Sequence, residues 1–339
     1  MKKVFCFGEV LLRYSPDTNG DWLTKNIMPA YIGGAELNVA TALAKWLVPV
    51  KYCTALPDNF LSEEIEDFII KHNIETSAIY YSGNRVGIYY LKQGADLKHA
   101  SVIYDRAWSS FSQLQPGMID WDIALQDVSW FHFSAISPGL NENVVAVCNE
   151  ALEAASKKGI TISVDLNYRD KLWKYGKEPK DVMPQLVEYC DVVMGNIWAA
   201  NTLLGVDVDD HIHDKKSRQA YLDHSRLTAN AIQKKYSKCK VVANTFRFDG
   251  VSTGIQYYTS LHTGDQQYPS PECITDTIIS KVGTGDCFMA GLIYGLYNHH
   301  PPQQVINFAT AAAFGKLQEE GDATNQDIAI IKERINNHG

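Results

Sequence analysis

Near the C-terminal end of the chain, residues 283–296 read GTGDCFMAGLIYGL. The apolar run that follows Asp286 predicts a helix buried on nearly every face. Asp286 therefore opens a buried helix, and Gly283 and Gly285 leave the backbone free to turn its N–H groups towards an anion. With Thr284 between the glycines, the stretch predicts an anion hole beside a carboxylate. Such a site suits a transferring phosphoryl group held next to a general base.

Outward from this stretch, short β-rich runs alternate with helical patterns along most of the chain. Strands are expected at residues 4–7, 51–56, 128–136, 160–166, 191–194 and 240–244. Several of these are continuous apolar runs, as in strands buried on both faces of a parallel sheet. Helices are expected at residues 35–47, 62–72, 142–158, 181–189 and 218–236. The alternation predicts an α/β fold with a doubly wound, mainly parallel sheet flanked by helices, in a single domain over residues 1–339.

Two regions break the alternation. Residues 11–32 and about 85–108 hold β-prone segments with no helix between them. They predict a small antiparallel sheet that stands off the main domain and covers the carboxyl ends of the strands as a lid. A pair of ordinary hairpins is the alternative. A further β-rich patch at residues 251–279 predicts a meander at the far edge of the main sheet.

Composition excludes several classes of function. The net charge of −8 and the isoelectric point near 5.7 argue against a nucleic-acid partner, because no basic stripe is present to neutralise phosphates. The seven cysteines form no Cys-x-x-Cys pair, which favours reduced core residues of a cytoplasmic protein. No apolar run approaches the length of a membrane span. His211 and His213 lie in a polar loop with no third ligand in view, so no metal site is predicted.

A second glycine motif lies near the N-terminus, where residues 33–38 read GGAELN. Gly33 and Gly34 allow a ligand to approach the backbone, and Asn38 projects an amide one turn into the following helix. Alone this is a weak signal. Together with residues 283–286, it makes the chain resemble the ribokinase-like sugar kinases of the phosphofructokinase B type. The resemblance covers essentially the whole chain and implies ATP and Mg²⁺ as cofactors.

Within that family the chain is most similar to the 2-keto-3-deoxygluconate kinases. The likeness is carried by RVGIYYL at residues 85–91, VIYDRA at 102–107 and DLNYRDKLW at 165–173. It implies a sugar pocket lined by Gly33, Gly34, Asn38, Tyr89, Tyr104, Arg106 and Arg169. Two arginines suit a sugar acid, because guanidinium groups bind carboxylates through two parallel hydrogen bonds.

Both arginines have alternatives. Arg106 could pair with Asp105 or with a lid carboxylate instead of substrate. Arg169 could pair with Asp165 or Asp170, or contact the nucleotide phosphates.

For Asp286 the resemblance implies a general base that accepts the proton of the sugar's primary hydroxyl as its oxygen attacks the γ-phosphorus. The alternative is a simple helix cap, since aspartate is a preferred N-cap residue. The nucleotide is expected over the C-terminal half, near Asn196, Thr245 and Arg247, with the helix around residues 307–313 as the adenine wall. Asp322 falls where related kinases place a late site residue, but it is equally consistent with a solvated loop aspartate.

The chain departs from the family pattern at three places. Ser280 and Lys281 precede the glycine motif, where an aspartate is common, which puts in doubt a monovalent-cation or structural hydrogen-bond role there. Ala199 replaces a glutamate that is usually linked to hydrated Mg²⁺. Glu9 and Arg13 replace the aspartate pattern of ribose-type members, which again favours an anionic substrate.

Three interpretations follow. The first is an ATP-dependent kinase of a sugar acid, with 2-keto-3-deoxygluconate converted to its 6-phosphate. The second keeps the fold and takes fructose or another neutral sugar. The third is a sugar-binding regulator that has lost catalysis. A homodimer through the lid is also expected, with tyrosines 80, 81, 89 and 90 and Trp108 forming an apolar face; those aromatic residues could instead cover the lid's own underside.

Overall fold

The computed structural model describes residues 2–16, 20–92, 102–215, 217–249 and 254–338. Its centre is a ten-stranded sheet with the strand order β15-β14-β13-β12-β11-β10-β1-β4-β6, and β16 pairs with β14 beside this path. The run from β12 to β6 is parallel throughout. The strands of this sheet are β1 (Lys3–Phe7), β4 (Val50–Cys53), β6 (Ile74–Glu75), β10 (Val128–Ser134), β11 (Thr161–Asp165), β12 (Val192–Met194), β13 (Val241–Asp249), β14 (Ile255–Thr263), β15 (Gln266–Pro269) and β16 (Cys273–Thr275).

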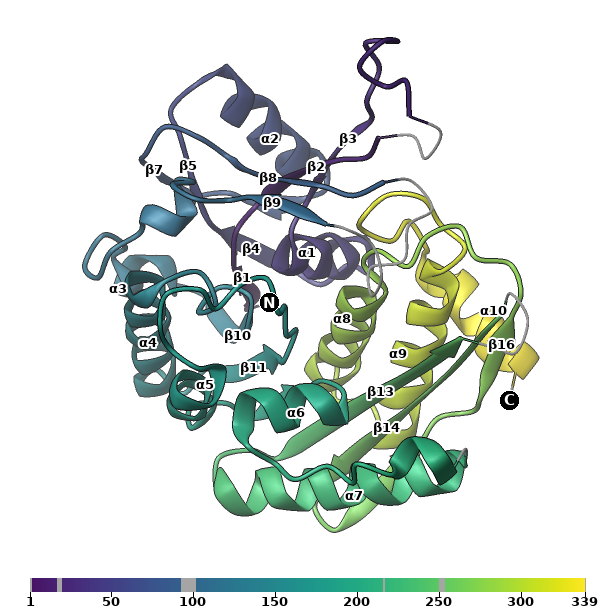
Figure 1. Cartoon of the computed structure of the whole chain (residues 1–339). Coiled ribbons are helices and arrows are strands. Elements are labelled where there is room, and N and C mark those ends of the chain that lie inside the picture. Colours follow the sequence, from purple (N-terminus) through teal and green to yellow (C-terminus); the bar gives the residue numbers. More distant parts are fainter. Residues whose placement is uncertain (1, 17–19, 93–101, 216, 250–253, 339) are drawn as a thin grey trace.

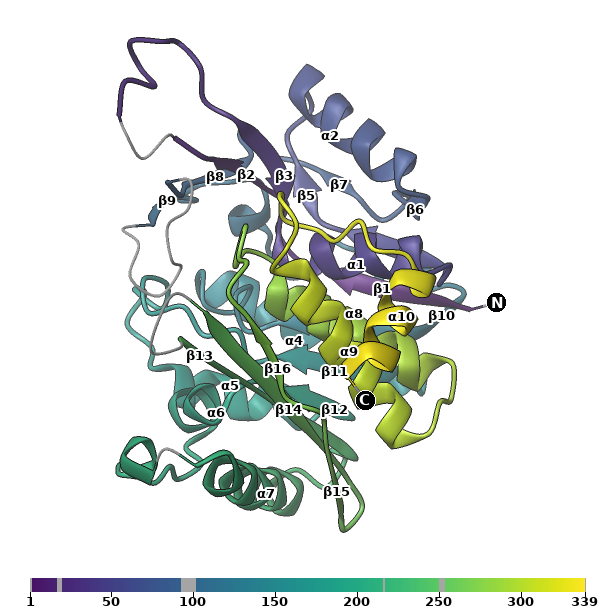
Figure 2. The same cartoon turned by 90° about the vertical axis from the view of Figure 1, so that its right-hand side faces the viewer.

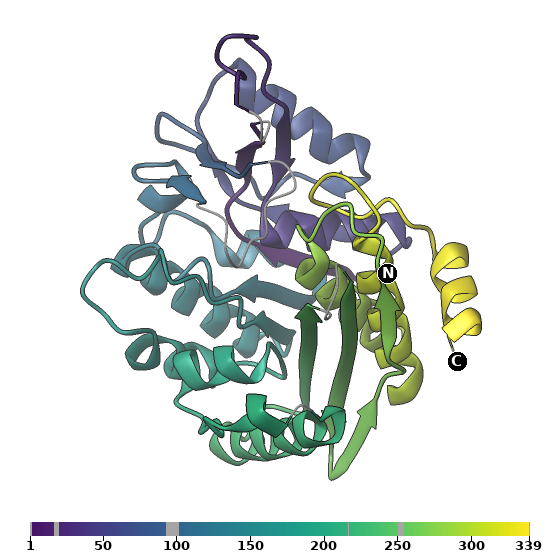
Figure 3. The same cartoon turned by 45° about the vertical axis from the view of Figure 1, so that its right-hand side comes forward.

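Helices cover both faces of this sheet, as Figure 1 shows. On one face pack α1 (Ala35–Lys45), α8 (Thr284–Tyr297) and α9 (Pro302–Lys316), joined there by α2 (Phe60–Lys71) and, outside α9, by α10 (Ile328–His338). On the other face pack α3 (Trp121–Ala124), α4 (Glu142–Lys157), α5 (Pro179–Val187), α6 (Ile197–Leu204) and α7 (Arg218–Lys235). Figure 3 shows α10 and the C-terminus outermost, on the side away from α7. The predicted doubly wound α/β architecture is confirmed.

Local sequence explains why several of these helices begin where they do. The side chains of Asn59, Asn141 and Ser217 accept hydrogen bonds from backbone N–H groups in the first turns of α2, α4 and α7. Such caps satisfy donors that have no partner within the helix. By contrast, α1 and α8 begin at Gly34 and Gly283, with no side-chain cap. The first-turn N–H groups of these two helices therefore remain available to other acceptors.

A small second sheet stands at one end of the molecule, above the main sheet (Figure 2). Its order is β3 (Ala30–Gly33), β2 (Leu11–Tyr14), β8 (Gly87–Tyr90) and β9 (Ile103–Asp105). The separate lid sheet predicted from residues 11–32 and 85–108 is confirmed, although residues 17–19 and 93–101 lie outside the described residues. The outer pairs are antiparallel, as expected, whereas the central pair of β2 with β8 is parallel.

The structure refines the expected elements at several points. The run predicted at residues 51–56 divides into β4 and the separate β5 (Ala55–Leu56), which pairs with β7 (Tyr80–Tyr81) in a two-stranded sheet. The meander at the far edge of the main sheet is present, as β14, β15 and β16 pair antiparallel beyond β13. The helices α3, α6 and α10 lay outside the expected set. Two short 3₁₀ helices occupy Phe111–Gln113 and Ile212–Lys215. No described helix is long and apolar enough to cross a membrane.

Candidate active site

The glycine motif of residues 283–286 forms the start of α8. Gly283 is the N-cap residue, with φ 73°, a backbone conformation that side chains rarely adopt. Asp286 lies in the first turn of α8 and is only 8 % exposed. In this turn Thr284 and Asp286 are buried, whereas Gly285 is exposed, so the start of α8 places a buried carboxylate beside an accessible stretch of backbone. Its N–H groups and the carboxylate can therefore act on the same bound group.

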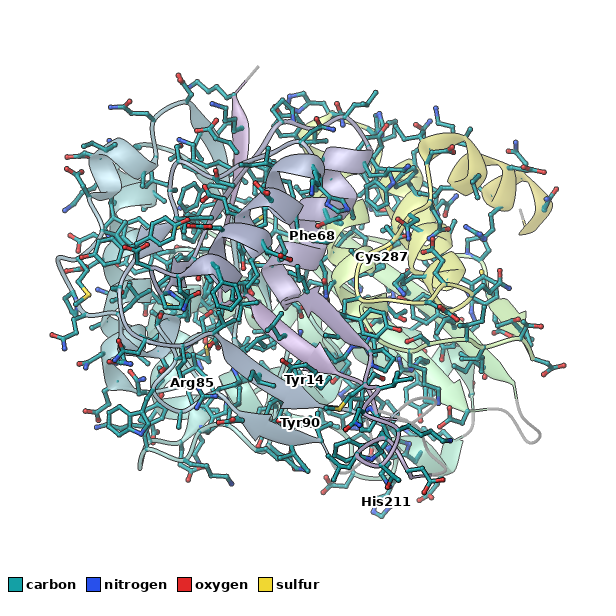
Figure 4. All side chains as sticks on the ribbon, turned by 90° about the horizontal axis from the view of Figure 1, so that it is seen from above. Tyr14, Phe68, Arg85, Tyr90, His211 and Cys287 are labelled. Carbon is teal, nitrogen blue, oxygen red and sulfur yellow. The ribbon has the colours of Figure 1, made fainter. Side chains whose placement is uncertain are left out.

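The two glycine motifs meet through Asn38 and Asp286. Asn38 lies in the first turn of α1, and its Nδ2 donates a hydrogen bond of 2.7 Å to Oδ2 of Asp286 across 248 residues of sequence. The helices α1 and α8 pack against each other behind this contact. Figure 4 views this region from above and labels Cys287, the residue after Asp286 in α8. The bond fixes one carboxylate oxygen of Asp286, so the other can face a reacting hydroxyl.

Asp322 joins the same two motifs from a third direction. A Cβ added to Gly33 would overlap its side chain, and a Cβ added to Gly283 would overlap its carbonyl oxygen. Its carboxylate accepts hydrogen bonds from Nε of Arg13 at 2.8 Å and from the hydroxyl of Tyr89 at 3.1 Å. Asp322 is 3 % exposed. The interpretation as a solvated loop residue is therefore wrong, and the aspartate is part of the framework of the site.

Three buried carboxyl groups gather near the start of α8. Burial raises the pKa of Asp286 to about 6, while the hydrogen bond from Asn38 and the charge of Arg169 oppose that rise. Burial and the charge of Asp286 raise the pKa of Asp165, at the end of β11, well above its usual value. Burial also raises the pKa of Glu36 to about 7. Burial therefore disfavours the ionised forms of these carboxyl groups, and a nearby cation would favour them.

Glu36 connects the start of α1 to the end of β10. Its Oε1 accepts hydrogen bonds from the backbone N–H of Ser134 at 2.9 Å and from the hydroxyl of Ser134 at 2.6 Å. A Cβ on Gly8 would overlap this carboxyl group, so the close approach of β1 requires glycine there. The sequence signal was available, since Glu36 lies inside the GGAELN motif, but sequence reasoning missed it.

Arg106 is held by the protein itself. Its Nε donates a hydrogen bond of 2.7 Å to Oε2 of Glu9, and both side chains are buried, with 5 % and 2 % exposure. Arg106 thus pairs neither with Asp105 nor with a carboxylate of the lid strands, but with Glu9 in the segment between β1 and β2, while Asp105 pairs with Arg85 at 2.9 Å. Arg169 differs, since it is partly exposed beyond β11 and its Nη1 donates to the carbonyl of Tyr168 at 3.2 Å, with no carboxylate of the described residues paired to it.

The lid reaches down onto the glycine motif of α8. Tyr89 in β8 packs against Tyr104 in β9 with ring centroids 6.1 Å apart. Both contact a small apolar cluster in which Leu91 and Val102 of the lid meet Val282, the residue before Gly283. On the opposite face of the lid sheet, Tyr14 of β2 and Tyr90 of β8 stack, with ring centroids 5.6 Å apart (Figure 4). The structure thus brings Gly33, Gly34, Asn38, Tyr89 and Tyr104 together with the start of α8.

A cavity of about 710 Å³ opens beside this arrangement. Tyr104 and Arg106 are the predicted site residues that line it, whereas Asp286 and the glycine motifs do not. Other lining residues include Trp108, Asn141, Lys171 and Trp173. The Nζ of Lys171 donates to the carbonyl of Val102 at 2.6 Å, which ties the wall of this cavity to the lid.

The residues predicted for the nucleotide lie on the C-terminal half of the sheet. Asn196 and Thr245 each follow by two residues the register pair Met194 and Ala243, so they lie at the same edge of the neighbouring strands β12 and β13. The Oδ1 of Asn196 caps α6 by accepting from the N–H of Ala199 at 2.8 Å. Arg247 lies further along β13 and is partly exposed. Within the described part of the chain, no hydrogen bond or ion pair joins these three residues to Asp286, so their grouping with the site remains a prediction.

The carboxyl groups of the site bear on how a metal ion could be held. Among the residues that the structure describes, no group of three or more His, Cys, Asp or Glu side chains is arranged to hold a metal ion. The buried carboxyl groups with raised pKa values do favour a nearby cation, as Asp165 and Glu36 show. These residues fit a Mg²⁺ ion that is held mainly by nucleotide phosphates and water, and not one caged by protein ligands.

Comparison with known proteins agrees with this geometry. The family model of the pfkB family carbohydrate kinases matches residues 1–329. A 2-dehydro-3-deoxygalactonokinase of Haloferax volcanii is 27 % identical over 318 residues, which are 93 % of this chain and 91 % of that protein. The crystal structure of a 2-dehydro-3-deoxygluconokinase from Thermotoga maritima superposes with a TM-score of 0.89 at 32 % identity, covering 99 % of this chain and 100 % of that one.

A more distant structure shares the fold alone. A fructokinase with bound ATP from Xylella fastidiosa superposes with a TM-score of 0.73 at 16 % identity, covering 99 % of both chains. The fold, the glycine-capped helix with its carboxylate and the family match together define an enzyme that transfers a phosphoryl group to a sugar hydroxyl. The chain belongs to the pfkB family of carbohydrate kinases.

Proposed function

We propose that this kinase phosphorylates a sugar acid, 2-keto-3-deoxygluconate, at its 6-hydroxyl with ATP and Mg²⁺. The observation that carries the proposal is the hydrogen bond from Asn38 to Asp286 at the glycine-capped start of α8, because it places a buried carboxylate where the two motifs meet. The names of the similar proteins, which act on 2-dehydro-3-deoxy sugar acids, support the substrate class. The two epimeric acids, of the gluco and galacto series, are both candidates.

In the proposed mechanism Asp286 is the general base. Its second carboxylate oxygen accepts the proton of the primary hydroxyl while that oxygen attacks the γ-phosphorus. A pKa of about 6 suits the role, because the group is ionised at neutral pH yet basic enough to take a proton. Asn38 keeps the carboxylate oriented.

The first-turn N–H groups at Gly283, Thr284 and Gly285 form the proposed anion hole. As N-terminal groups of α8 they lack partners within the helix, and in the proposed mechanism they donate to the phosphoryl oxygens on which charge develops. Bound Mg²⁺ would add positive charge at the nucleotide phosphates. Asn196, Thr245 and Arg247, with the helix α9 around residues 307–313, form the proposed nucleotide side.

Arg169 is the proposed partner of the substrate carboxylate. It is partly exposed and close enough to Asp286 to lower the pKa of that residue, whereas Arg106 already pairs with Glu9. Arg106 then acts by holding the lid strands over the sugar, with Tyr89 and Tyr104 as the wall of the pocket. Gly33 and Gly34 allow the sugar to approach the backbone.

The experiment that tests the proposal is a coupled phosphorylation assay across a panel. The panel contains 2-keto-3-deoxygluconate, 2-keto-3-deoxygalactonate, fructose and ribose. We expect the acids to be turned over with far higher kcat/KM than the neutral sugars, and Asp286→Asn to lose several orders of magnitude in turnover while it still binds ATP. A preference for fructose would establish the neutral-sugar alternative. Binding of the acid without ATP consumption would establish the inactive regulator instead.

We also propose that the chain forms a homodimer through its lid and works in a reducing, cytoplasmic compartment. The lid exposes apolar side chains, among them Ile103 at 61 % and Trp108 at 77 % exposure. All seven cysteines are free and buried, which supports the compartment. Tyr89 does not belong to this apolar face. Its hydroxyl donates to Asp322, which fits the alternative that it covers the underside of the lid.

A further inference from the structure

Lys316 is a buried cation beside the candidate site that the proposed reaction does not use. It is the last residue of α9, its exposure is 0 %, and its Nζ donates to the carbonyls of Glu319 at 3.2 Å and Gly321 at 3.1 Å. Burial lowers the pKa of Lys316, and the charge of Glu319 opposes that change. Burying an ammonium group is costly unless hydrogen bonds and opposite charges compensate it. Its position therefore calls for a physical explanation.

The loop that Lys316 binds is the one that packs on the anion hole. This loop ends at Asp322, whose carbonyl oxygen would overlap a Cβ on Gly283. The Cε of Lys316 would lie 3.6 Å from the same Cβ. The charge of Lys316 also lowers the pKa of Asp286. The ammonium thus lies beside the backbone of the motif, next to the loop that ends at Asp322.

The end of α9 also holds the residues that precede the glycine motif of α8. The backbone N–H groups of Ile279 and Ser280 donate to the carbonyl of Leu317 at 2.8 Å and 3.3 Å. The segment that leads into Gly283 and the loop that lies beside Gly283 are therefore both fastened to one helical turn. Lys316 adds a side chain and a charge to that fastening.

We propose that Lys316 is a positioning residue for phosphoryl transfer. Its ammonium is a built-in cation that gathers the carbonyls of Glu319 and Gly321, and through Asp322 it holds the N–H groups of the anion hole at the start of α8. Carbonyl oxygens gathered around a positive charge would equally suit a bound alkali cation. The side chain supplies that charge permanently, so the enzyme needs no dissolved potassium. This inference rests on the proposed kinase function.

The first test replaces the charge and keeps the length of the side chain, in Lys316→Met. We expect kcat to fall on the order of 10²-fold, because a displacement of about 1 Å in the transfer geometry has that effect. The KM for the sugar acid should change little, since the carbonyls that Lys316 binds, those of Glu319 and Gly321, are not among the proposed sugar contacts. A general loss of structure would move both constants and the melting temperature together.

Lys51 offers a matched control. It is also a buried lysine, 5 % exposed, whose Nζ donates to two carbonyls, those of Ala124 at 3.3 Å and Gln126 at 3.5 Å. It pairs with Glu75 at 3.2 Å, and none of these partners belongs to the candidate site. Lys51→Met should lower the melting temperature and leave kcat as in the wild type.

The second test is rescue by a dissolved cation. Lys316→Ala removes the ammonium and leaves the carbonyls of Glu319 and Gly321 facing free space. Potassium chloride or ammonium chloride should raise its turnover roughly tenfold or more above that in choline chloride of equal ionic strength, since a hydrogen bond to a charged group is worth that much. Wild-type turnover should be the same in potassium and in choline.

The outcomes separate cleanly. A folded Lys316→Met enzyme with wild-type turnover overturns the inference, and so does a wild-type enzyme that works only in potassium. If neither variant folds, the comparison of wild-type turnover in potassium and choline decides alone. A wild-type protein that turns over no sugar or sugar acid overturns the proposed function, and the inference with it.

Discussion

Asp286 has neighbours that an ordinary helix cap does not need. A capping aspartate accepts from N–H groups of its own helix, whereas this carboxylate accepts from Asn38 on a different helix. Burial raises its pKa to about 6, against the opposing effects of the Asn38 hydrogen bond and the charges of Arg169 and Lys316. At the scale of single residues, the site is a carboxylate balanced between desolvation and nearby cations, and its protonation should be visible in kinetics.

The first prediction concerns pH. If Asp286 is the base, only its ionised form is active, so kcat/KM should fall about tenfold per unit below a pH of about 6 and be level above it. The residual activity of Asp286→Asn should lack this acidic limb. Burial also raises the pKa of Glu36, to about 7. Glu36→Gln is therefore the control, and it should keep the limb; a limb that vanishes in this variant would point to Glu36 instead.

The second prediction concerns substrate charge. Arg169→Ala should raise KM for a 2-keto-3-deoxy sugar acid roughly 10–100-fold, the worth of a hydrogen bond between charged groups, and leave fructose kinetics nearly unchanged. The assay is best run above pH 8, because loss of the arginine charge also raises the pKa of Asp286. Arg169→Lys keeps the charge without the forked geometry, so its KM for the sugar acid should lie between those of the wild type and Arg169→Ala. Equal losses on acid and ketose would remove Arg169 from carboxylate recognition.

At the scale of elements, the position of α8 depends on its contact with α9. A Cβ on Gly291 would lie 2.5 Å from the Cα of Ala309 and 3.0 Å from its Cβ, so the two helices approach as closely as backbone allows. Gly295 makes a similar approach to Val305. Since α8 carries Asp286 and α9 carries Lys316, this contact sets the distance between the proposed base and the buried cation.

The third prediction tests that contact. In an open helix Gly→Ala stabilises by about 1 kcal/mol, yet Gly291→Ala should destabilise the protein by about 1–3 kcal/mol, because overpacking forces the backbones apart. Gly285→Ala is the control for stability, since it lies in the same helix with nothing within 4 Å of the added Cβ. Thermal unfolding should show a lowered melting temperature for Gly291→Ala and not for Gly285→Ala. Equal melting temperatures would mean that α8 and α9 can separate freely.

At the scale of the whole molecule, the lid is both a cover and an exposed surface. Its lower side contacts the site through Tyr89 and through the cluster of Leu91, Val102 and Val282. Its outer side exposes Ile103. An apolar sheet face of this kind is typical of an interaction surface, which is why the homodimer is proposed there.

The fourth prediction follows from that surface. Light scattering should give about twice the chain mass of 37.9 kDa, and Ile103→Lys should shift it to the monomer value, because a charge in an apolar interface is costly to bury. Ile330→Lys is the control, as Ile330 is 46 % exposed on α10, away from the lid. A wild-type protein that scatters as a monomer at micromolar concentration would contradict the proposal.

Much of this protein could be predicted from its sequence because the relevant signals are local. Glycines before an apolar helix, alternating strands and helices, and β-prone segments without helices are patterns of neighbouring residues, and they predicted the sheet, the lid and the two motifs. The helix α6 escaped because it is short, with Asn196 as its cap. The parallel pairing of β2 with β8 could not be predicted, because no local sequence signal decides whether two strands run parallel or antiparallel.

By itself, the order of residues determined the class of enzyme, the carboxylate at Asp286 and the glycines that leave its helix uncapped. Only the tertiary structure decided which charges meet. It paired Arg106 with Glu9, buried Asp322 between the motifs and set Lys316 beside Gly283 at the start of α8. The reason is physical: ion pairs and desolvation depend on distance and burial in space, and residues far apart in the chain acquire both only when it folds.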